Sequence, residues 1–500
     1  MAANILSLFV LMPLFGAILT MGLGEPSRFR RVLSLLVQGL VVALSVFTLR
    51  EVLLHGPIVL AVGNWILPFG ISLTADALGV AFVATAHVVA FGILLQECLV
   101  RSHHAEPRAL FPLLHFMTMG ASLAFLTGDF FNLFVAFEIL LVSSYALLGL
   151  EPAGRRAREA FPYLLLNIFG SALFLVAAAF AYSTYGTLNF VDLGTRISLS
   201  ADEDRKRLFG ALCLTVFGLK AGLVPLHFWL PRAYPILRPT VAALFAAILT
   251  KVGVYALLRI GTNVANFETL GIDRVLVVGG VLTLVFGGLG ALSRSNVRGI
   301  LAFHIVAQVG YMLLGLGLGG PLALTGVVLF ALHNMIVKPG LFLVGGVALD
   351  AQGSDELARS GGLLAVAPSL AGIFLVLALS LSGFPPLSGF WSKYVLLNGA
   401  LAQGTLTEFA FLLLGGLLTL LSMIKIWAGV FWPHGDATPE LRHRISRRTL
   451  VVPMLLAGLS VLLGLGLGDF VGVAETTVDQ AQNHDELRVR GESVGEKGRP

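Results

Sequence analysis

The sequence predicts an all-α integral membrane protein with about fourteen transmembrane helices. Hydrophobic residues make up 57% of the 500 positions and charged residues only 12%, a balance that soluble domains do not show. Apolar runs of about 20 residues, the length that crosses roughly 30 Å of hydrocarbon, recur along the whole chain between short polar interruptions. The first run lacks the basic leader of a secretory signal, so we expect it to be retained as a span.

The apolar runs give the order of the spans. They lie near residues 2–23, 31–50, 73–97, 108–126, 130–150, 157–184, 207–230, 240–260, 273–292, 299–318, 322–349, 363–399, 406–432 and 449–470. The twelfth run is too long for one straight helix and contains Pro385 and Pro386, which predicts a broken helix. Residues 51–72 are interrupted by proline and glycine, which predicts an extended or hairpin-like connection. From residue 475 the chain is polar with no apolar period, which predicts a disordered tail.

Basic residues are concentrated in alternate loops, and this distribution predicts the orientation of the chain. If the N-terminus lies outside, the inner loops hold 17 arginines, whereas the outer loops and their edges hold seven basic residues, Arg259 among them. Cytoplasmic loops are enriched in lysine and arginine, so both termini are expected on the outer side. Asp76, near the start of the third span, is expected at the membrane interface. The same bias accounts for the net charge of +5 without a nucleic-acid partner.

Two spans share a motif that predicts an internal repeat. The seventh span contains Gly-Leu-Val-Pro-Leu-His-Phe-Trp from Gly222 to Trp229, and the twelfth contains Gly-Phe-Pro-Pro-Leu-Ser-Gly-Phe-Trp from Gly383 to Trp391. The two spans are five apart, an odd number, so they cross the membrane in opposite directions. An inverted repeat with one broken helix in each half is the architecture in which transporters place ion sites near the membrane midplane.

Lysines inside the spans are the main functional candidates. Lys220 and Lys251 lie well inside the seventh and eighth spans, where a charge costs about 2.5 to 3.5 kcal/mol on insertion scales. Lys338 lies in the eleventh span, and Lys393 follows the break in the twelfth. Residues of this kind usually face a polar interior and take part in function. Lys425 lies nearer a helix end, where its ammonium can reach the interface, so structural and functional interpretations both stay open.

Glu138 is the one clearly intramembrane carboxylate of the span at 130–150, and a lysine partner is expected for it. An isolated carboxylate in lipid would simply protonate. Burial disfavours a charged lysine and a nearby carboxylate favours it, so a Glu138 that approaches or leaves Lys220 could switch whether the lysine holds its proton. The alternative is a static buried salt bridge.

Histidines in the spans add groups that titrate near neutral pH. His333 precedes Lys338 by five positions, which favours a functional role. His304 and His227 are explained equally well by packing. Polar side chains that could hydrogen-bond water between these groups are Asn167, Ser171, Thr250, Gln308, Asn334, Ser388 and Ser392.

Motifs for cofactors are absent from the sequence. We find no dinucleotide-binding G-x-G-x-x-G in a strand-turn-helix context, no phosphate-binding loop, and no cysteine set for haem or an iron-sulfur cluster. The two cysteines, Cys98 and Cys213, lack the spacing of a disulfide framework or a zinc site. No cofactor is therefore expected, and energy must come from an ion gradient or from partner proteins.

Five stretches resemble the antiporter-type subunits shared by respiratory complex I, membrane-bound hydrogenases and the multi-subunit Na+/H+ antiporters called Mrp. They run from Gly128 to Glu138, Gly218 to Pro231, Pro239 to Tyr255, His333 to Lys338 and Gly383 to Lys393, within a similarity that covers about residues 70 to 435. Residues 129–138 and the Gly-Thr-Leu-Asn at 186–189 are most similar to the D-type subunit of Mrp antiporters. The chain is too short for the A-type subunit and lacks the long lateral helix of the L-type complex I subunit. Lys393 differs from the glutamate of the M-type subunit, whereas the N-type subunit has a lysine, so that alternative stays open.

The resemblance implies fourteen helices with two inverted five-helix repeats, spans 4–8 and 9–13. The chain then divides into N-terminal spans 1–3 at 1–107, a first repeat at 108–260, a second repeat at 261–435, span 14 at 436–474 and the tail at 475–500. The resemblance also implies a central polar axis. In it Glu138 and Lys220 form a pair, Lys251 and His333 or Lys338 relay protons, and Lys393 ends the path, with His227, His304 and Lys425 as secondary candidates.

The resemblance and the charged residues favour one function over two alternatives. The favoured function is a proton-translocating subunit of a monovalent cation/proton antiporter, not an enzyme, in the bacterial cytoplasmic membrane with partners that resemble the Mrp subunits of types A, B, C, E, F and G. An ammonium can release a proton, whereas Na+ prefers an oxygen cage that the sequence does not provide, so a partner is expected to carry Na+. The first alternative is a proton-pumping subunit of complex I or a hydrogenase. The second is an autonomous carrier for an organic substrate, which only the inverted repeat supports.

Overall fold

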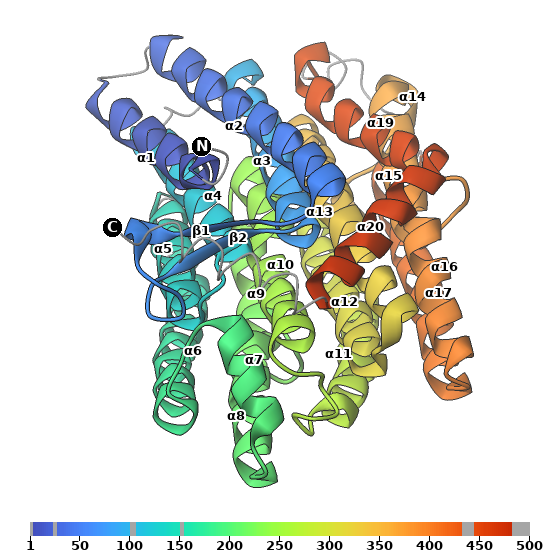
Figure 1. Ribbon diagram of the computed structural model, residues 1–500. Helices are drawn as coiled ribbons and strands as arrows, with labels where there is room; N and C mark the ends of the chain where they lie inside the picture. The colour runs from blue at the N-terminus through green and yellow to red at the C-terminus, as the bar shows by residue number, and fades with distance from the viewer. Residues whose placement is uncertain (1–3, 24–27, 101–106, 151–154, 433–444, 483–500) are drawn as a thin grey trace.

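The computed structural model describes residues 4–23, 28–100, 107–150, 155–432 and 445–482. In this part the chain forms a bundle of helices and one two-stranded hairpin (Figure 1). The helices are α1 Ile5–Gly22, α2 Arg28–His55, α3 Ala77–Leu99, α4 Leu110–Leu126, α5 Phe130–Gly149, α6 Arg155–Tyr185, α7 Phe190–Leu199, α8 Glu203–Ala221, α9 Trp229–Ala233, α10 Pro239–Asn263, α11 Asp273–Ser293, α12 Val297–Leu318, α13 Gly320–Gln352, α14 Leu363–Val366, α15 Pro368–Ser382, α16 Ser388–Ala402, α17 Leu406–Ile426, α19 Val451–Leu465 and α20 Leu467–Gln482. The strands are β1 Ile58–Ala61 and β2 Ser72–Ala75.

The predicted class, an all-α integral membrane protein, is confirmed. The described residues include 12 helical segments that are long and apolar enough to cross a membrane, and two shorter apolar helices, α4 and α15. The number fourteen and the grouping of the helices into two inverted repeats stay predictions.

Three helices form the centre of the bundle. The apolar windows of α10, α12 and α13 are 100% buried, whereas those of α1, α2, α6, α11, α17 and α19 are between 28% and 39% buried. Helix α20 runs obliquely across the bundle and packs on α3, α10 and α13 (Figure 1). The polar residues of the central helices are therefore enclosed by protein on all sides.

The extended or hairpin-like connection expected at 51–72 is a two-stranded hairpin at 58–75 that ties several helix ends together, whereas residues 51–55 belong to α2. Strands β1 and β2 pair antiparallel, with Ile58 opposite Ala75. The Gly128 N–H donates to the Ser72 carbonyl at 2.9 Å, and Asp129 pairs with Asn189 in an isolated bridge. Asp129 then caps α5 by accepting from the Asn132 N–H at 2.8 Å. The starts of α5 and α7 are thus fixed against β2.

The seventh and twelfth spans are both broken, as the sequence predicts. Helix α8 ends at Gly222 with φ 93°, and α15 ends at Gly383 with φ 94°. Both ends show the same hydrogen bonds, because the glycine and the residue after it donate back to carbonyls of the last helical turn. Glycine adopts this left-handed conformation at little cost, and the prolines that follow cannot donate to continue the helix.

The expectation of a disordered tail is wrong for residues 475–482. Residues 475–482 belong to α20, whose buried face includes Ala474, Thr477 and Val478. This face packs on neighbouring helices, and its burial stabilises α20. The composition of the segment alone does not indicate that such a contact exists. Residues 483–500 of the expected tail lie outside the described residues.

Replacement of Gly389 by alanine should destabilise the second break. A β carbon on Gly389 would lie 1.8 Å from the Ser380 carbonyl oxygen and 2.8 Å from His333 Cε1. Overpacking of this kind costs about 1–3 kcal/mol, so we expect a lower melting temperature for the purified protein in detergent. Gly372→Ala is the matched control, because nothing lies within 4 Å of the position that its β carbon would take. Equal melting temperatures for both variants would contradict the close packing of α15 on α16.

Candidate functional site

Lys220 lies at the end of α8, directly before the break. Its side chain is buried, and its ammonium donates to the Asn167 carbonyl at 3.0 Å and to Ser171 Oγ at 3.1 Å, both on α6. The carbonyl end of a helix carries partial negative charge, which favours a cation there. The end of α8 and the polar groups of α6 together hold this ammonium inside the protein.

Glu138 is half-buried on α5 and makes no salt bridge to Lys220, since no N–O contact within 4.0 Å joins the two side chains. Its Oε1 atom is buried without a hydrogen bond among the described residues. Its charge nevertheless acts on the Lys220 ammonium. The static salt bridge considered as an alternative is therefore not the arrangement in this structure, and the functional pairing of Glu138 with Lys220 stays a prediction.

A small cavity lies beside Lys220. Its volume is ≈ 10 Å³, and its lining includes Tyr163, Asn167, Lys220 and Trp229. A cavity needs roughly 10–15 Å³ to hold one water molecule, which also requires two or more polar partners. Tyr163 additionally shares a hydrogen bond with Ser144 of α5. The cavity therefore has about the space for one water between Lys220 and the polar groups of α6.

Three more lysines, here called the lysine cluster, consist of Lys251 on α10, Lys338 on α13 and Lys393 on α16. All three are buried. The Lys251 ammonium donates to the Ala246 carbonyl at 2.8 Å, whereas the Lys338 ammonium has no hydrogen bond among the described residues. Lys338 interacts electrostatically with both other lysines. Lys251 from the expected first repeat and Lys393 from the expected second repeat thus both lie within electrostatic range of Lys338.

Lys393 satisfies its ammonium at the second break. It donates to the carbonyl of Ser382, the last residue of α15, at 3.1 Å and lies 5.1 Å from the centre of the Tyr311 ring. A helix carboxyl end and an aromatic face each attract a cation without carrying a full charge. The two broken helices therefore each place a lysine at the carboxyl end of their first segment.

Two histidines border the lysine cluster. His333 Nδ1 lies 2.9 Å from Ser388 Oγ, and its ring interacts electrostatically with all three lysines of the cluster. His304 on α12 hydrogen-bonds Ser422 and interacts with Lys338 and Lys393. Both side chains are buried, so the cluster has two imidazoles within electrostatic range.

Helix α10 connects Lys220 to the lysine cluster. A β carbon on Gly253 would lie 2.7 Å from the Ala221 nitrogen and 3.0 Å from the Lys220 carbonyl carbon. The backbones of α8 and α10 therefore touch at Lys220, two residues beyond Lys251 on α10. A larger residue at position 253 would push the two helices apart.

Two secondary candidates lie in apolar or carbonyl-lined surroundings. His227 follows the first break and packs its ring against Phe286 at 4.8 Å. The Lys425 ammonium donates to the carbonyls of Leu292 and Arg294 at 2.6 and 2.7 Å, at the end of α11. These contacts favour the structural interpretation that the sequence left open for Lys425.

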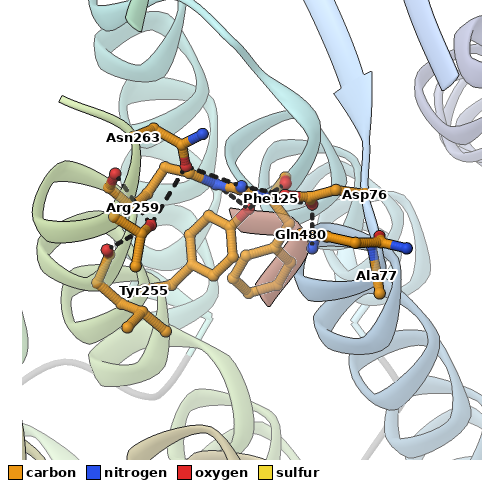
Figure 2. A network of polar contacts seen from close by, with 10 residues as sticks. Asp76, Ala77, Phe125, Tyr255, Arg259, Asn263 and Gln480 are labelled. Carbon is orange, nitrogen blue, oxygen red and sulfur yellow. Dashed lines mark hydrogen bonds and ion pairs between the residues drawn. The ribbon is translucent and has the colours of Figure 1, made fainter. Parts of the chain in front are cut away.

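The structure joins Asp76 and Arg259 in a buried contact that the sequence does not predict. The sequence places Asp76 at the membrane interface and Arg259 at the edge of an outer loop, and these membrane depths stay predictions. The two side chains are 0% and 4% exposed and form an ion pair (Figure 2). Arg259 Nη2 donates to Asp76 Oδ1 at 2.7 Å, and Arg259 also bonds Tyr255 and Asn263. The reason is the full burial of α10, which carries Arg259 inside the bundle. Two signals in the sequence could have predicted the pair: Arg259 lies within an apolar run, and Asp76 lies just before a different apolar run.

The backbone next to the ion pair binds α20, and the pair itself connects three further helices. Asp76 caps α3 by accepting from the Gly79 N–H at 2.8 Å, and Gln480 of α20 accepts from the adjacent Ala77 N–H at 2.9 Å (Figure 2). Tyr255 donates to the Phe125 carbonyl at the end of α4. Both oxygens of the Asp76 carboxylate are therefore engaged, which indicates a fixed structural link between α3, α4 and α10.

The chain is a multi-pass helical bundle with buried titratable side chains at two broken helices. These features are typical of ion-translocating membrane proteins. The chain belongs to the NADH:quinone oxidoreductase/Mrp antiporter transmembrane family, whose model matches residues 127–419. The matched stretch contains Glu138, Lys220 and the whole lysine cluster, and it ends before α19.

Several known proteins resemble the chain over nearly its whole length. It is 37% identical over 92% of its residues to the D subunit of the Na+/H+ antiporter of Alkalihalophilus pseudofirmus, of which it covers 94%. A chain in the structure of the Mrp complex from Dietzia sp. superimposes with a TM-score of 0.90 and 29% identity, with 98% and 100% of the two chains covered. A chain of an archaeal membrane-bound sulfane sulfur reductase superimposes with a TM-score of 0.89 and 25% identity, with 97% and 99% covered.

Proposed function

We propose that this chain is the proton-translocating subunit of a multi-subunit monovalent cation/proton antiporter of the Mrp type. The observation that carries the proposal is a series of four buried lysines, Lys220 and the lysine cluster, on four helices and without an ion pair among the described residues. An unpaired ammonium is costly in an apolar interior, and lysine, unlike arginine, can give up its proton. Such side chains are suited to accepting and passing on protons.

The proposed path begins at Glu138 and Lys220 and ends at Lys393. The contact of α8 with α10 at Gly253 supports a step from Lys220 to Lys251. The electrostatic coupling of Lys338 with both neighbouring lysines supports its place in the middle, with His333 as the second candidate for that step. Protons need water or hydroxyls between such groups, and the cavity of ≈ 10 Å³ at Lys220 supports one such water.

The proposal includes the architecture that the resemblance implies. Fourteen spans result if α4 and the α15–α16 pair cross the membrane, and the matching ends of α8 and α15 support two inverted repeats at spans 4–8 and 9–13. The arginine distribution supports outer termini in a bacterial cytoplasmic membrane. The similarity to an antiporter D subunit and to an Mrp complex supports partners of the A, B, C, E, F and G types. We assign Na+ to one of these partners, since an ammonium can release a proton whereas Na+ prefers an oxygen cage.

A vesicle measurement on the complete complex tests the proposal. Inverted membrane vesicles are acidified and a fluorescent pH probe is followed while Na+ is added, with no electron donor present. We expect Na+-dependent loss of the pH gradient, because an antiporter needs only the two ion gradients. Vesicles without the complex are the control. The proposal would be contradicted if the pH gradient of vesicles with an assembled complex did not respond to Na+ but formed when an electron donor was supplied.

That contradicting result would establish the second candidate, a proton-pumping membrane subunit of a redox enzyme. The likeness to the archaeal respiratory complex, over 97% of the chain, is the observation that favours it. The buried lysines would serve there in the same way, because proton transfer does not depend on the source of energy. Co-purification with soluble redox proteins would distinguish this candidate from the antiporter.

A further inference from the structure

Three serine hydroxyls from three helices meet at the second break. Ser380 of α15, Ser388 of α16 and Ser460 of α19 form a group that we call the hydroxyl triad. Ser460 Oγ lies 2.6 Å from Ser380 Oγ and 2.8 Å from Ser388 Oγ, and the remaining separation is 3.5 Å. All three side chains are 0% or 1% exposed. The triad is thus a closed ring of buried hydroxyls.

The hydroxyl triad is joined to the lysine cluster through His333. Ser388 Oγ is the hydrogen-bond partner of His333 Nδ1 at 2.9 Å, whereas Nε2 has no partner among the described residues. The close approach of Gly389 to His333 Cε1 fixes the ring against α16. His333 therefore has one nitrogen on the triad and one nitrogen free to exchange a proton.

The triad hydroxyls are free to change direction. Most buried hydroxyls in the spans donate to a carbonyl of their own helix, as Ser45 does to Val42 at 2.8 Å. The three triad hydroxyls make no such bond within the described part of the chain. A hydroxyl can donate one bond and accept two, so the ring accepts either orientation without the loss of a helix hydrogen bond.

The two orientations match the two neutral forms of His333. When the ring proton is on Nε2, Ser388 donates to Nδ1, Ser460 donates to Ser388, and Ser380 donates to Ser460. When the ring proton is on Nδ1, His333 donates to Ser388, and the three hydroxyls point around the ring in the opposite sense. The number of protons is the same in both forms, and in the second form Ser380 donates to Ser388 across the long, 3.5 Å side of the ring.

We infer that the hydroxyl triad lets His333 exchange its two tautomers, and that Ser460 is a positioning residue for proton transfer through His333. The inference rests on the proposed function. Nε2 can accept a proton only when the ring proton is on Nδ1, and it can donate one only when it carries the ring proton itself, so the balance of the two tautomers sets whether His333 takes or gives a proton at Nε2. The triad supplies a partner for Nδ1 in both forms.

Ser460 lies in α19, beyond the residues 127–419 that match the family. The helix is held at the break by the Trp391 indole, which donates to the Gly464 carbonyl at 3.0 Å. A β carbon on Gly464 would lie 2.0 Å from the Pro386 carbonyl oxygen, so the two backbones are in contact. Helix α19 thereby places the Ser460 hydroxyl next to Ser388, the hydrogen-bond partner of His333.

Nitrogen NMR of the histidine ring tests the inference directly. The complete complex is labelled with ¹⁵N-histidine, and a His333→Gln sample identifies the His333 signals. We expect both tautomers in the wild type and a shift toward the Nε2-protonated form in Ser460→Ala, by about five-fold for the loss of one hydrogen bond. Without Ser460 the Ser388 hydroxyl lacks a good acceptor in the other form and donates to Nδ1 instead.

Three further variants complete the test. Ser460→Thr keeps the hydroxyl and should keep both tautomers, and Ser380→Ala removes another triad member and should act like Ser460→Ala if that variant does not assemble. Ser45→Ala removes a buried hydroxyl elsewhere and should change nothing. Unchanged tautomer populations in Ser460→Ala and Ser380→Ala would overturn the inference. The NMR result does not depend on Na+ exchange, so failure of the proposed function would be seen separately in the vesicle measurement.

Discussion

Asp76→Asn is expected to remove most of the assembled protein from the membrane. The substitution leaves Arg259 buried without a counter-charge, because its guanidinium is 4% exposed and Asp76 is its ion-pair partner. Breaking a buried pair by removal of one partner costs about 3–5 kcal/mol. Asparagine keeps an oxygen that can accept from the Gly79 N–H, so the cap of α3 is retained and the charge is the main change. Size-exclusion chromatography and the melting temperature of the solubilised protein measure the effect.

Two controls separate the buried charge from a general loss of contacts. Asp192→Asn removes the acid of a pair with Arg196, whose side chain is 44% exposed, and should cost about 0–1 kcal/mol. Asp76→Asn combined with Arg259→Met removes both charges and should recover part of the lost stability, since the unpaired guanidinium is gone. Wild-type stability in Asp76→Asn alone would show that the pair is not needed.

The helices and their breaks could be predicted from the sequence because their causes are local. Long apolar runs fix where the chain crosses the membrane, and a glycine followed by proline fixes where a helix ends. Gly222 and Gly383 therefore lie at the expected breaks. The buried lysines could be identified for a similar reason, since a charge within an apolar run is visible in the sequence itself.

The partners of these residues could not be predicted because they depend on how distant helices pack. Ser380 and Ser460 are 80 positions apart. No motif around either serine indicates that its hydroxyl takes part in a buried hydrogen-bond group. Arg259 lies close to the end of a span, where the sequence gives no sign of a partner, and its ion pair with Asp76 depends on the packing of α3 on α10. Helix α20 shows the same limit, because a polar sequence becomes an ordered helix only through the face that it buries.

Lys220→Ala is expected to abolish Na+-driven proton movement while the complex still assembles. The side chain bonds only to α6 and lies beside a small cavity, so its truncation leaves no charge unpaired within 4.0 Å. A positioned acid-base group contributes roughly 10²- to 10⁴-fold to a proton-transfer rate. The fluorescence signal of vesicles that hold the variant complex should therefore fall to that of vesicles without the complex.

Two variants, Lys220→Arg and Lys425→Ala, test why activity is lost in Lys220→Ala. They distinguish the loss of a group that transfers protons from the loss of a positive charge. Arginine keeps the positive charge at the end of α8 but does not release its proton, so Lys220→Arg should be as inactive as Lys220→Ala. Lys425→Ala removes an ammonium that binds carbonyls at the end of α11, and most of the Na+ response should remain. Activity in Lys220→Arg would mean that position 220 needs only a fixed positive charge. The proton path from Glu138 to Lys251 would then have to run through the water-sized cavity, and no proton would reside on Lys220.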